Sequence, residues 1–436
     1  MANRILIKDR HGKHGQILIM LAIAISVLLI FAGLAIDFGI AYTHQTALSR
    51  AVDAAALEGM RNLSQGSTAA KQLANDTFTA NVQALGAFAT PPTFSFAQNT
   101  DSFGNETVTI TGTIYWQPLF LRVFLPATVP ITEAATVSRA PLYMSLVLDQ
   151  SYSMASNGGS TALPTAVTDF VNQFDDSSDH VAVVSFATVA TIGPKMSSSP
   201  PFKTAVANYV NAMTYTTANP YTFAQTGLDN GLAQINSVTL PTNAQKVIVF
   251  FTDGWPNMVS DALNCNPPSA TRTTLNFTMC DAGDDSLGLC TTSFPLAVFT
   301  TGNGNTTCGT CNGYPSYASS DPCYPAPTGM TFHSLQNNTF ETPTQTNVSN
   351  EAFYRAEASA LTAQNQNVTL YSIGLGTAIT GQTVAQQFLY QVANDPAGSS
   401  YNSSLPQGQA VFAPTSSQLD AVFQQIASKI LLRITQ

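Results

Sequence analysis

The stretch Met144-Ser-Leu-Val-Leu-Asp149-Gln-Ser151-Tyr-Ser153 joins an apolar run to a carboxylate and two hydroxyls at alternate positions. Such an apolar run predicts a strand that is buried on both faces. In open α/β sheets, binding crevices lie at the C-terminal tips of strands of this kind. One charged and two neutral oxygen ligands suit a hard cation such as Mg²⁺. The stretch therefore predicts a cation site at the edge of a sheet, and an ordinary turn after a strand is the alternative.

Strand-like and helix-like patterns alternate from Leu142 to the C-terminus. Further buried strands are predicted at 181–186, 246–253 and 368–373, with helical stripes between and after them. The last helix is predicted at 419–430, opened by a capping box at Ser417-x-x-Asp420. This alternation predicts a mostly parallel sheet with helices on both faces.

Three separate parts of the chain resemble the metal-ion-dependent adhesion site of the von Willebrand factor A (VWA) family. The family's Asp-x-Ser-x-Ser motif matches Asp149, Ser151 and Ser153. Its threonine near the start of a helix matches Thr222, and its aspartate at the tip of the central strand matches Asp253. The resemblance implies a VWA (Rossmann-like), doubly wound α/β fold for residues 141–436.

The resemblance also implies how the site would work. Hydroxyls of Ser151, Ser153 and Thr222 would bind Mg²⁺, or Ca²⁺ or Mn²⁺, while the two aspartates would act largely through water. With few direct anionic ligands, the cation could take a carboxylate from a partner protein as its last ligand. The threonine loop departs from the family's frequent Gly-Gly-Thr-Asn, so Thr226 is a second candidate. The alternative is a VWA domain without metal, whose Asp and Ser residues only cap turns.

The N-terminal region has the composition of a membrane anchor. Residues 1–14 are basic, and residues 17–36 form an almost uninterrupted apolar run, close to the roughly 20 residues that span a bilayer core. The basic flank predicts a cytoplasmic N-terminus with the remainder outside. A cleaved signal peptide is the alternative, but its apolar core is usually about 7–15 residues long. The longer run here, which continues into Asp37, favours a retained anchor.

Helical spacing continues from Tyr42 to Met60, so the membrane helix is predicted to extend outward as one rod. Residues 15–62, with Asp37 after the apolar run and Asp53-Ala-Ala-Ala-Leu57 further on, resemble the N-terminal segment of TadG-like proteins of Tad (tight adherence) Flp-pilus systems. The alternative is any signal anchor followed by an Ala-rich helix. The resemblance implies a single-pass bacterial inner-membrane protein with a periplasmic or extracytoplasmic C-terminal domain.

These patterns predict a domain plan. Residues 1–14 would be a cytoplasmic tail, and 15–62 the membrane helix with its continuation. Residues 63–140 would form a helix and a small β-rich module of unknown role, followed by the VWA domain. Within that domain, the helix–strand rhythm stops between about 255 and 347, directly after Asp253. The interruption is therefore predicted to rise on the metal face of the sheet.

All six cysteines fall in this insert, and an even number in one segment predicts disulfides and an oxidising compartment. The candidates, whose connectivity the sequence leaves open, are Cys265, Cys280, Cys290, Cys308, Cys311 and Cys323. Two other hypotheses exist for Cys308-Gly-Thr-Cys311. It could carry out thiol–disulfide exchange, or it could bind zinc together with Cys290 and Cys323. The sequence around it lacks the strand-to-helix pattern that thioredoxin-like catalysis uses.

Composition and motifs narrow the function. The chain has 436 residues, only 9% of them charged, and a net charge of −9, which argues against nucleic acid. The sequence shows neither a Ser/His/Asp set nor a phosphate loop, so we predict no enzyme. By resemblance, the protein would assist Flp/Tad pilus assembly or anchoring by binding a carboxylate of a pilus or secretion-apparatus component. A VWA adhesin or surface receptor unrelated to pili is the alternative.

Overall fold

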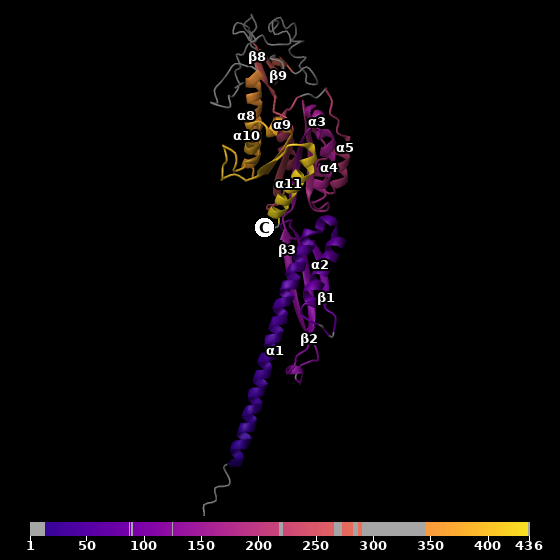
Figure 1. Ribbon diagram of the computed structural model, residues 1–436, viewed down its shortest axis with the longest axis vertical. Coiled ribbons are helices and arrows are strands. Elements are labelled where there is room, and N and C mark those ends of the chain that lie inside the picture. The colour runs from indigo at the N-terminus through magenta and orange to yellow at the C-terminus, as the bar shows by residue number, and fades with distance from the viewer. Residues whose placement is uncertain are drawn as a thin grey trace, which may run out of the picture. The chain divides into compact units, whose positions relative to one another are not determined.

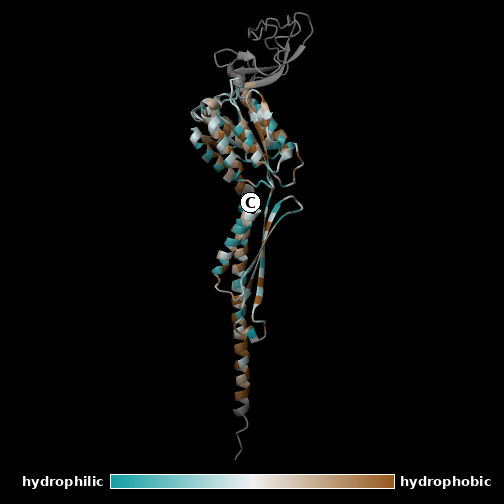
Figure 2. Cartoon of the chain, turned by 90° about the vertical axis from the view of Figure 1, so that its right-hand side faces the viewer, coloured by the Kyte–Doolittle hydropathy of each residue, from teal (hydrophilic) through white to brown (hydrophobic). Residues whose placement is uncertain are grey.

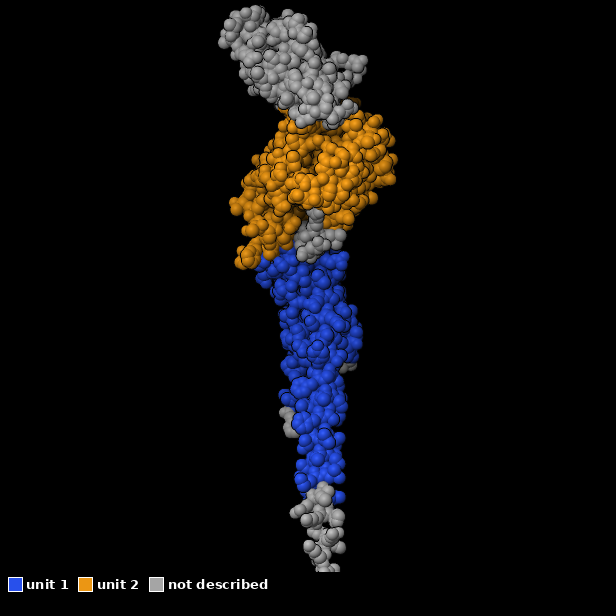
Figure 3. All heavy atoms as spheres, turned by 90° about the vertical axis from the view of Figure 1, so that its left-hand side faces the viewer, with its two compact units in different colours: residues 1–101, 106–139 blue, residues 102–105, 140–436 orange. Residues whose placement is uncertain are grey.

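The computed structural model divides the chain into two compact units, residues 1–101 with 106–139 and residues 102–105 with 140–436 (Figure 3). The residues that the structure describes are 14–86, 88, 90–123, 125–217, 221–265, 273–281, 287–289 and 345–434.

A single long helix, α1, runs from His14 to Arg61 (Figure 1). Its N-terminal half is apolar on all sides and exposed, as the brown ribbon of Figure 2 shows. In the most apolar 18-residue window of α1, only 6% is buried. This part of the helix is therefore not packed in a protein core. By length and composition α1 is able to cross a membrane, and it continues without a break beyond the apolar run, as the periodicity predicts.

The C-terminal half of α1 packs in the first unit. It shares a core with α2 (Ser67–Gln83) and an antiparallel sheet of β1 (Thr93–Thr100), β2 (Glu106–Trp116) and β3 (Val129–Arg139). Side chains along β2 alternate between buried and half-buried, which is the pattern of a strand with one face against a core. Short 3₁₀ turns, η1 (Leu63–Gln65) and η2 (Leu121–Val123), join these elements.

The second unit is the mostly parallel α/β fold that the sequence predicts. Its six-stranded sheet has the order β12-β11-β7-β4-β5-β6, and only β6 is antiparallel to its neighbour. The strands are β4 (Leu142–Asp149), β5 (His180–Phe186), β6 (Ala190–Ile192), β7 (Gln245–Thr252), β11 (Thr369–Leu375) and β12 (Gln409–Ala413). The central strands are buried throughout, because helices cover both faces of the sheet.

Two helical layers form the cores on either side of this sheet. One layer contains α4 (Gly159–Val171), α5 (Lys203–Ala212) and α11 (Leu419–Ile434). The other contains α6 (Ala224–Asn236), α8 (Gln345–Asn365) and α10 (Thr383–Ala393). Shorter turns are α3 (Ser153–Ser156), α9 (Thr377–Thr380), η3 (Met196–Ser198) and η4 (Ser416–Gln418). The predicted capping box at Ser417–Asp420 is wrong, because the capping box of the structure is formed by Thr415 and Gln418 around η4.

Two glycines let α6 lie close to the sheet. A Cβ on Gly227 would lie 2.8 Å from the Phe186 ring, and one on Gly231 would lie 2.5 Å from Val147 Cγ2. Larger side chains at these positions would push the helix away from β4 and β5. The close approach fixes the start of α6 beside the C-terminal tip of β4.

The described residues between β7 and α8 contain strands but no helix, and the sequence analysis did not predict these strands. β8 (Met258–Cys265), β9 (Thr273–Asp281) and β10 (Leu287–Leu289) form an antiparallel sheet there. In β9 the apolar residues Leu275, Phe277 and Met279 alternate with polar ones, which is the period of a strand.

Two of the cysteines lie in this sheet. Cys265 is opposite Thr273 and Cys280 is opposite Met258, at the two ends of the β8–β9 pair. Their backbones are about 23 Å apart by strand rise. The other four cysteines and the CxxC motif lie outside the described residues. Disulfide formation therefore stays a prediction.

The carboxyl group of Glu357 is half-buried between α8 and α10. With the Gln391 amide turned so that its nitrogen faces this carboxyl, it donates a hydrogen bond to Oε2 at 2.8 Å, and no salt bridge to Glu357 occurs in the described part of the chain. Burial raises the pKa of Glu357 to about 8, against an ordinary value of 4.5. The folded protein therefore binds this proton more tightly than the unfolded chain does.

We expect Glu357→Gln to stabilise the protein at pH 8 but not at pH 5. The protonated carboxyl stabilises the fold fully below the unfolded pKa, and this contribution is lost as pH rises from about 4.5 towards 8. Gln keeps the neutral form, so the variant should gain about 1–2 kcal/mol at pH 8. Thermal unfolding at both pH values measures the gain, with Asp229→Asn, an exposed carboxylate on α6, as the control. An equal effect of Glu357→Gln at both pH values would contradict the expectation.

Candidate functional site

The C-terminal ends of β4 and β7 form the centre of the candidate site. The two strands are parallel neighbours, with Leu148 paired to Phe251. Asp149 is the last residue of β4, and Asp253 directly follows β7. Because parallel strands end at the same edge of a sheet, the two carboxylates are brought together there.

Asp149 is fully buried and its carboxylate is held by two hydrogen bonds. Oδ1 accepts from the Ser151 backbone N–H at 2.7 Å, and Oδ2 accepts from Thr252 Oγ1 at 2.6 Å. Burial, and after it the nearby charge of Asp253, raises the pKa of Asp149 to about 7. Ionisation of these two buried carboxylates is therefore disfavoured, and a cation bound beside them would favour it.

The serines connect the two carboxylates. Ser151 Oγ lies 2.9 Å from Ser153 Oγ, and Ser153 Oγ donates to Asp253 Oδ1 at 2.7 Å. The other oxygen of Asp253 accepts from Asn157 Nδ2 at 2.8 Å. These contacts join the Asp-x-Ser-x-Ser loop to the tip of β7 in one continuous polar network.

Thr222 reaches the same place from a third loop. A Cβ built on Gly254 would lie 3.4 Å from Thr222 Oγ1 and 3.6 Å from Ser153 Oγ, so both hydroxyls border the space beside Gly254. Asn257 makes two hydrogen bonds to the Thr222 backbone. Its Oδ1 accepts from the Thr222 N–H at 2.8 Å, and its own backbone N–H donates to the Thr222 carbonyl at 3.3 Å. Thr226 instead lies within α6, where its hydroxyl accepts from Asn230.

The structure thus brings all five predicted residues to one sheet edge, together with residues that the sequence argument missed. Thr252, Asn157 and Asn257 each bond a predicted residue, and their positions next to the motifs could have indicated this role. Tyr215 is not next to any of the motifs, so its position in the sequence did not indicate a role at the site. Its buried hydroxyl has no hydrogen-bond partner in the described part of the chain, and burial, followed by the charges of Asp149 and Asp253, raises its pKa.

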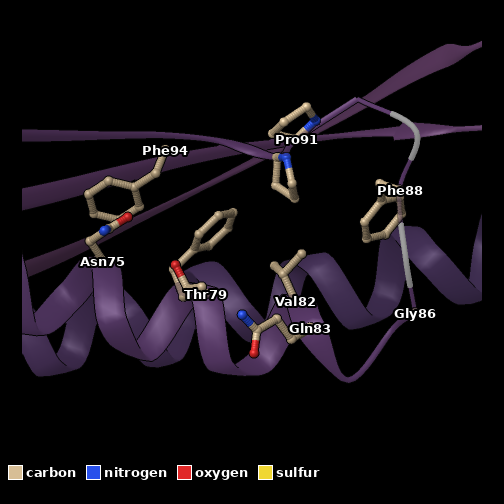
Figure 4. A pocket seen from close by; sticks show the side chains of 10 residues that line it. Asn75, Thr79, Val82, Gln83, Gly86, Phe88, Pro91 and Phe94 are labelled. Carbon is tan, nitrogen blue, oxygen red and sulfur yellow. The ribbon is translucent and has the colours of Figure 1, made fainter.

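The donor atoms at this edge fit a hard cation. Three hydroxyl oxygens and two carboxylates are oxygen ligands of the kind that Mg²⁺ and Ca²⁺ prefer. No cluster of three or more His, Cys, Asp or Glu side chains occurs in the described ranges, so those ranges contain no zinc-type group. A hollow of the first unit, lined by Phe78, Val82, Phe88, Pro91 and Phe94 among others, contains no charged side chain and is unsuited to a cation (Figure 4).

Two protein-family models match this chain. Residues 144–277 match the von Willebrand factor type A domain. Residues 15–62 match the family described as putative Flp pilus-assembly TadE/G-like. Neither description names a catalytic activity. No curated protein matches the chain.

Several solved structures are similar to the chain at low identity. The pilus adhesin SpaC from Lactobacillus rhamnosus GG, in its open conformation, is 14% identical with a TM-score of 0.40, and the match covers 79% of this chain and 34% of SpaC. The vWF domain of the type V pili tip protein Mfa5 from Porphyromonas gingivalis is 16% identical with a TM-score of 0.37, covering 68% and 97%. The PilB minor pilin from Streptococcus sanguinis is 11% identical with a TM-score of 0.37, covering 80% of each. The chain spans about a third of the length of SpaC.

Proposed function

We propose that this TadG-like chain, in which a TadE/G-like segment precedes a VWA domain, is an envelope protein that assists the assembly or anchoring of an Flp/Tad-type pilus through metal-dependent protein binding. One observation carries the proposal: the hydroxyls of Ser151, Ser153 and Thr222 converge with the carboxylates of Asp149 and Asp253 at one edge of the sheet. In this proposal, residues 17–36 anchor the protein in the bacterial inner membrane with a cytoplasmic N-terminus.

The three hydroxyls would hold Mg²⁺, and Ca²⁺ or Mn²⁺ would suit the same oxygen set. When bound, the cation supplies an electrophilic point for a carboxylate of the partner. Asp149 fixes the Ser151 backbone, Asn157 and Ser153 orient Asp253, and Asn257 holds the Thr222 loop. Such orienting contacts usually matter for metal affinity nearly as much as the ligands themselves.

The partner is proposed to be a pilus or secretion-apparatus component that offers an acidic side chain. Neutral hydroxyl ligands leave the cation with unbalanced positive charge, which favours a carboxylate as the last ligand. The role is one of binding, without catalysis. The TadE/G-like segment favours a role in pilus assembly over the alternative of an adhesin unrelated to pili.

Mg²⁺ should raise the melting temperature of the protein relative to EDTA. At a concentration of about a hundred times Kd, a ligand of the folded state stabilises by roughly 2.7 kcal/mol, and for a domain of this size that corresponds to about 5–10 °C. Thr222→Val should remove the shift, since it deletes one hydroxyl of the set without a large change in shape. Thr226→Val, four residues along the chain, is the matched control and should keep it. A parent protein that melts identically in Mg²⁺ and EDTA would exclude the metal site.

A further inference from the structure

The loop between β2 and β3, residues 117–128, exposes large apolar side chains in the first unit. Leu119 is 66% exposed, Phe120 53% and Leu125 40%. Clustered apolar exposure of this kind usually marks a contact surface.

Asp37 of α1 fixes this loop. Its carboxylate accepts hydrogen bonds from the backbone N–H groups of three consecutive loop residues, at 2.9 Å, 2.8 Å and 2.6 Å from Leu119, Phe120 and Leu121. One turn earlier, a Cβ on Gly33 would lie 2.8 Å from Phe120 Cγ. The glycine therefore lets the Phe120 ring lie directly against α1. The loop is held by specific contacts at the last turn of the apolar run.

The surface of α1 at the same level is also apolar and exposed. Ile36 and Phe38 lie on either side of Asp37 in the sequence of α1, and their side chains are 47% and 61% exposed. Figures 1 and 2 show α1 beside the end of β2 that leads into the loop. Exposed apolar side chains of the loop and of α1 therefore adjoin where the Phe120 ring lies against α1.

We propose that the 117–128 loop is a second membrane contact, which inserts Leu119, Phe120 and Leu125 into the bilayer where α1 leaves it. The proposal rests on the membrane anchoring proposed above. Lipid is the favoured occupant because the loop continues the apolar surface of the anchor itself. Arg122 in this loop is exposed and has no salt-bridge partner among the described residues, so its guanidinium is free to reach lipid phosphates.

This geometry gives Asp37 a role. A carboxylate at the end of a membrane helix is costly unless it is paired, and the three loop N–H groups supply that pairing. Asp37 would therefore hold the loop against α1 and limit the rotation of the helix in the membrane.

Tryptophan quenching by spin-labelled lipids tests the proposal on the full chain in lipid nanodiscs that hold one copy. Trp116→Phe and Trp255→Phe first remove the two native tryptophans. Each test protein then carries one new tryptophan, from Leu119→Trp, Leu28→Trp or Phe103→Trp. Leu119→Trp should lose at least about half its fluorescence to a nitroxide high on the acyl chain, because interfacial side chains lie about 5–10 Å deep. Leu28→Trp should be quenched by a nitroxide near the chain end. Phe103→Trp, an exposed site at the other end of β2, should not be quenched.

The outcomes separate the loop from the anchor. If Leu28→Trp is quenched and Leu119→Trp behaves like Phe103→Trp, the loop does not enter the bilayer and its apolar face belongs to a protein partner. If Leu28→Trp escapes quenching, the anchoring itself fails, and the loop proposal fails with it. Circular dichroism of each variant shows that the compared proteins are folded.

Discussion

Asp149→Ala should abolish Mg²⁺-dependent capture of protein partners while leaving the VWA domain folded. The substitution removes the acceptor that fixes the Ser151 backbone and the Thr252 hydroxyl. Losing these bonds costs roughly 1–2 kcal/mol. Part of that cost is offset, because a buried carboxylate beside Asp253 is removed as well. The hydroxyl set loses its orientation, so the cation and the partner that depends on it should both be lost.

A pull-down from an envelope extract measures this effect, with the parent and the variant each compared in Mg²⁺ and EDTA. Asp229→Ala, an exposed carboxylate on α6, is the matched control and should capture partners like the parent. Recovery of a pilus or secretion component would favour assembly over the adhesin alternative. Capture by the parent that persists in EDTA would show that the cation is dispensable.

The α/β fold could be predicted because its signals are local. The apolar runs of β4 and β7 and the helical stripes between them are each visible in the sequence, and their alternation then predicts a parallel sheet. The placement of Asp149 and Asp253 followed, since both stand at strand ends. The meeting of Thr222 with Ser153 could be inferred only by resemblance, because it depends on how closely Gly227 and Gly231 let α6 approach the sheet.

Other features were not predicted. β9 carries an alternation of Leu275, Phe277 and Met279 with polar residues, but β8 and β9 lie in a Thr- and Asn-rich segment whose composition is also typical of loops. The loop that holds Leu119 is interrupted by prolines, and its bond to Asp37 joins residues more than 80 positions apart. Tyr215 lies in the segment between α5 and α6, near Asp149 and Asp253, and no sequence motif surrounds it. Such contacts are set by tertiary packing, which sequence period does not encode.

Gly408→Ala should destabilise the VWA domain by at least about 3 kcal/mol, at the upper end of single substitutions. Gly408 directly precedes β12, and its N–H donates to the Ala393 carbonyl at 2.9 Å. An added Cβ would overlap the Leu370 carbonyl oxygen of β11 and lie 2.6 Å from the Ala393 oxygen. Both are backbone atoms of regular elements, so neither can turn aside as a side chain would. The expected loss of melting temperature is about 6–12 °C.

Gly39→Ala is the control, because a Cβ there meets nothing within 4 Å. Gly408 lies at β12, whereas the candidate metal residues lie around β4 and β7. The folded fraction of Gly408→Ala should therefore bind Mg²⁺ like the parent, and partner capture should fall only in proportion to the unfolded fraction. Asp149→Ala should show the opposite pattern, a stable domain that captures nothing. If Gly408→Ala melts like the parent, the close approach of β12 to β11 and α10 is wrong, and with it the packing of that side of the sheet.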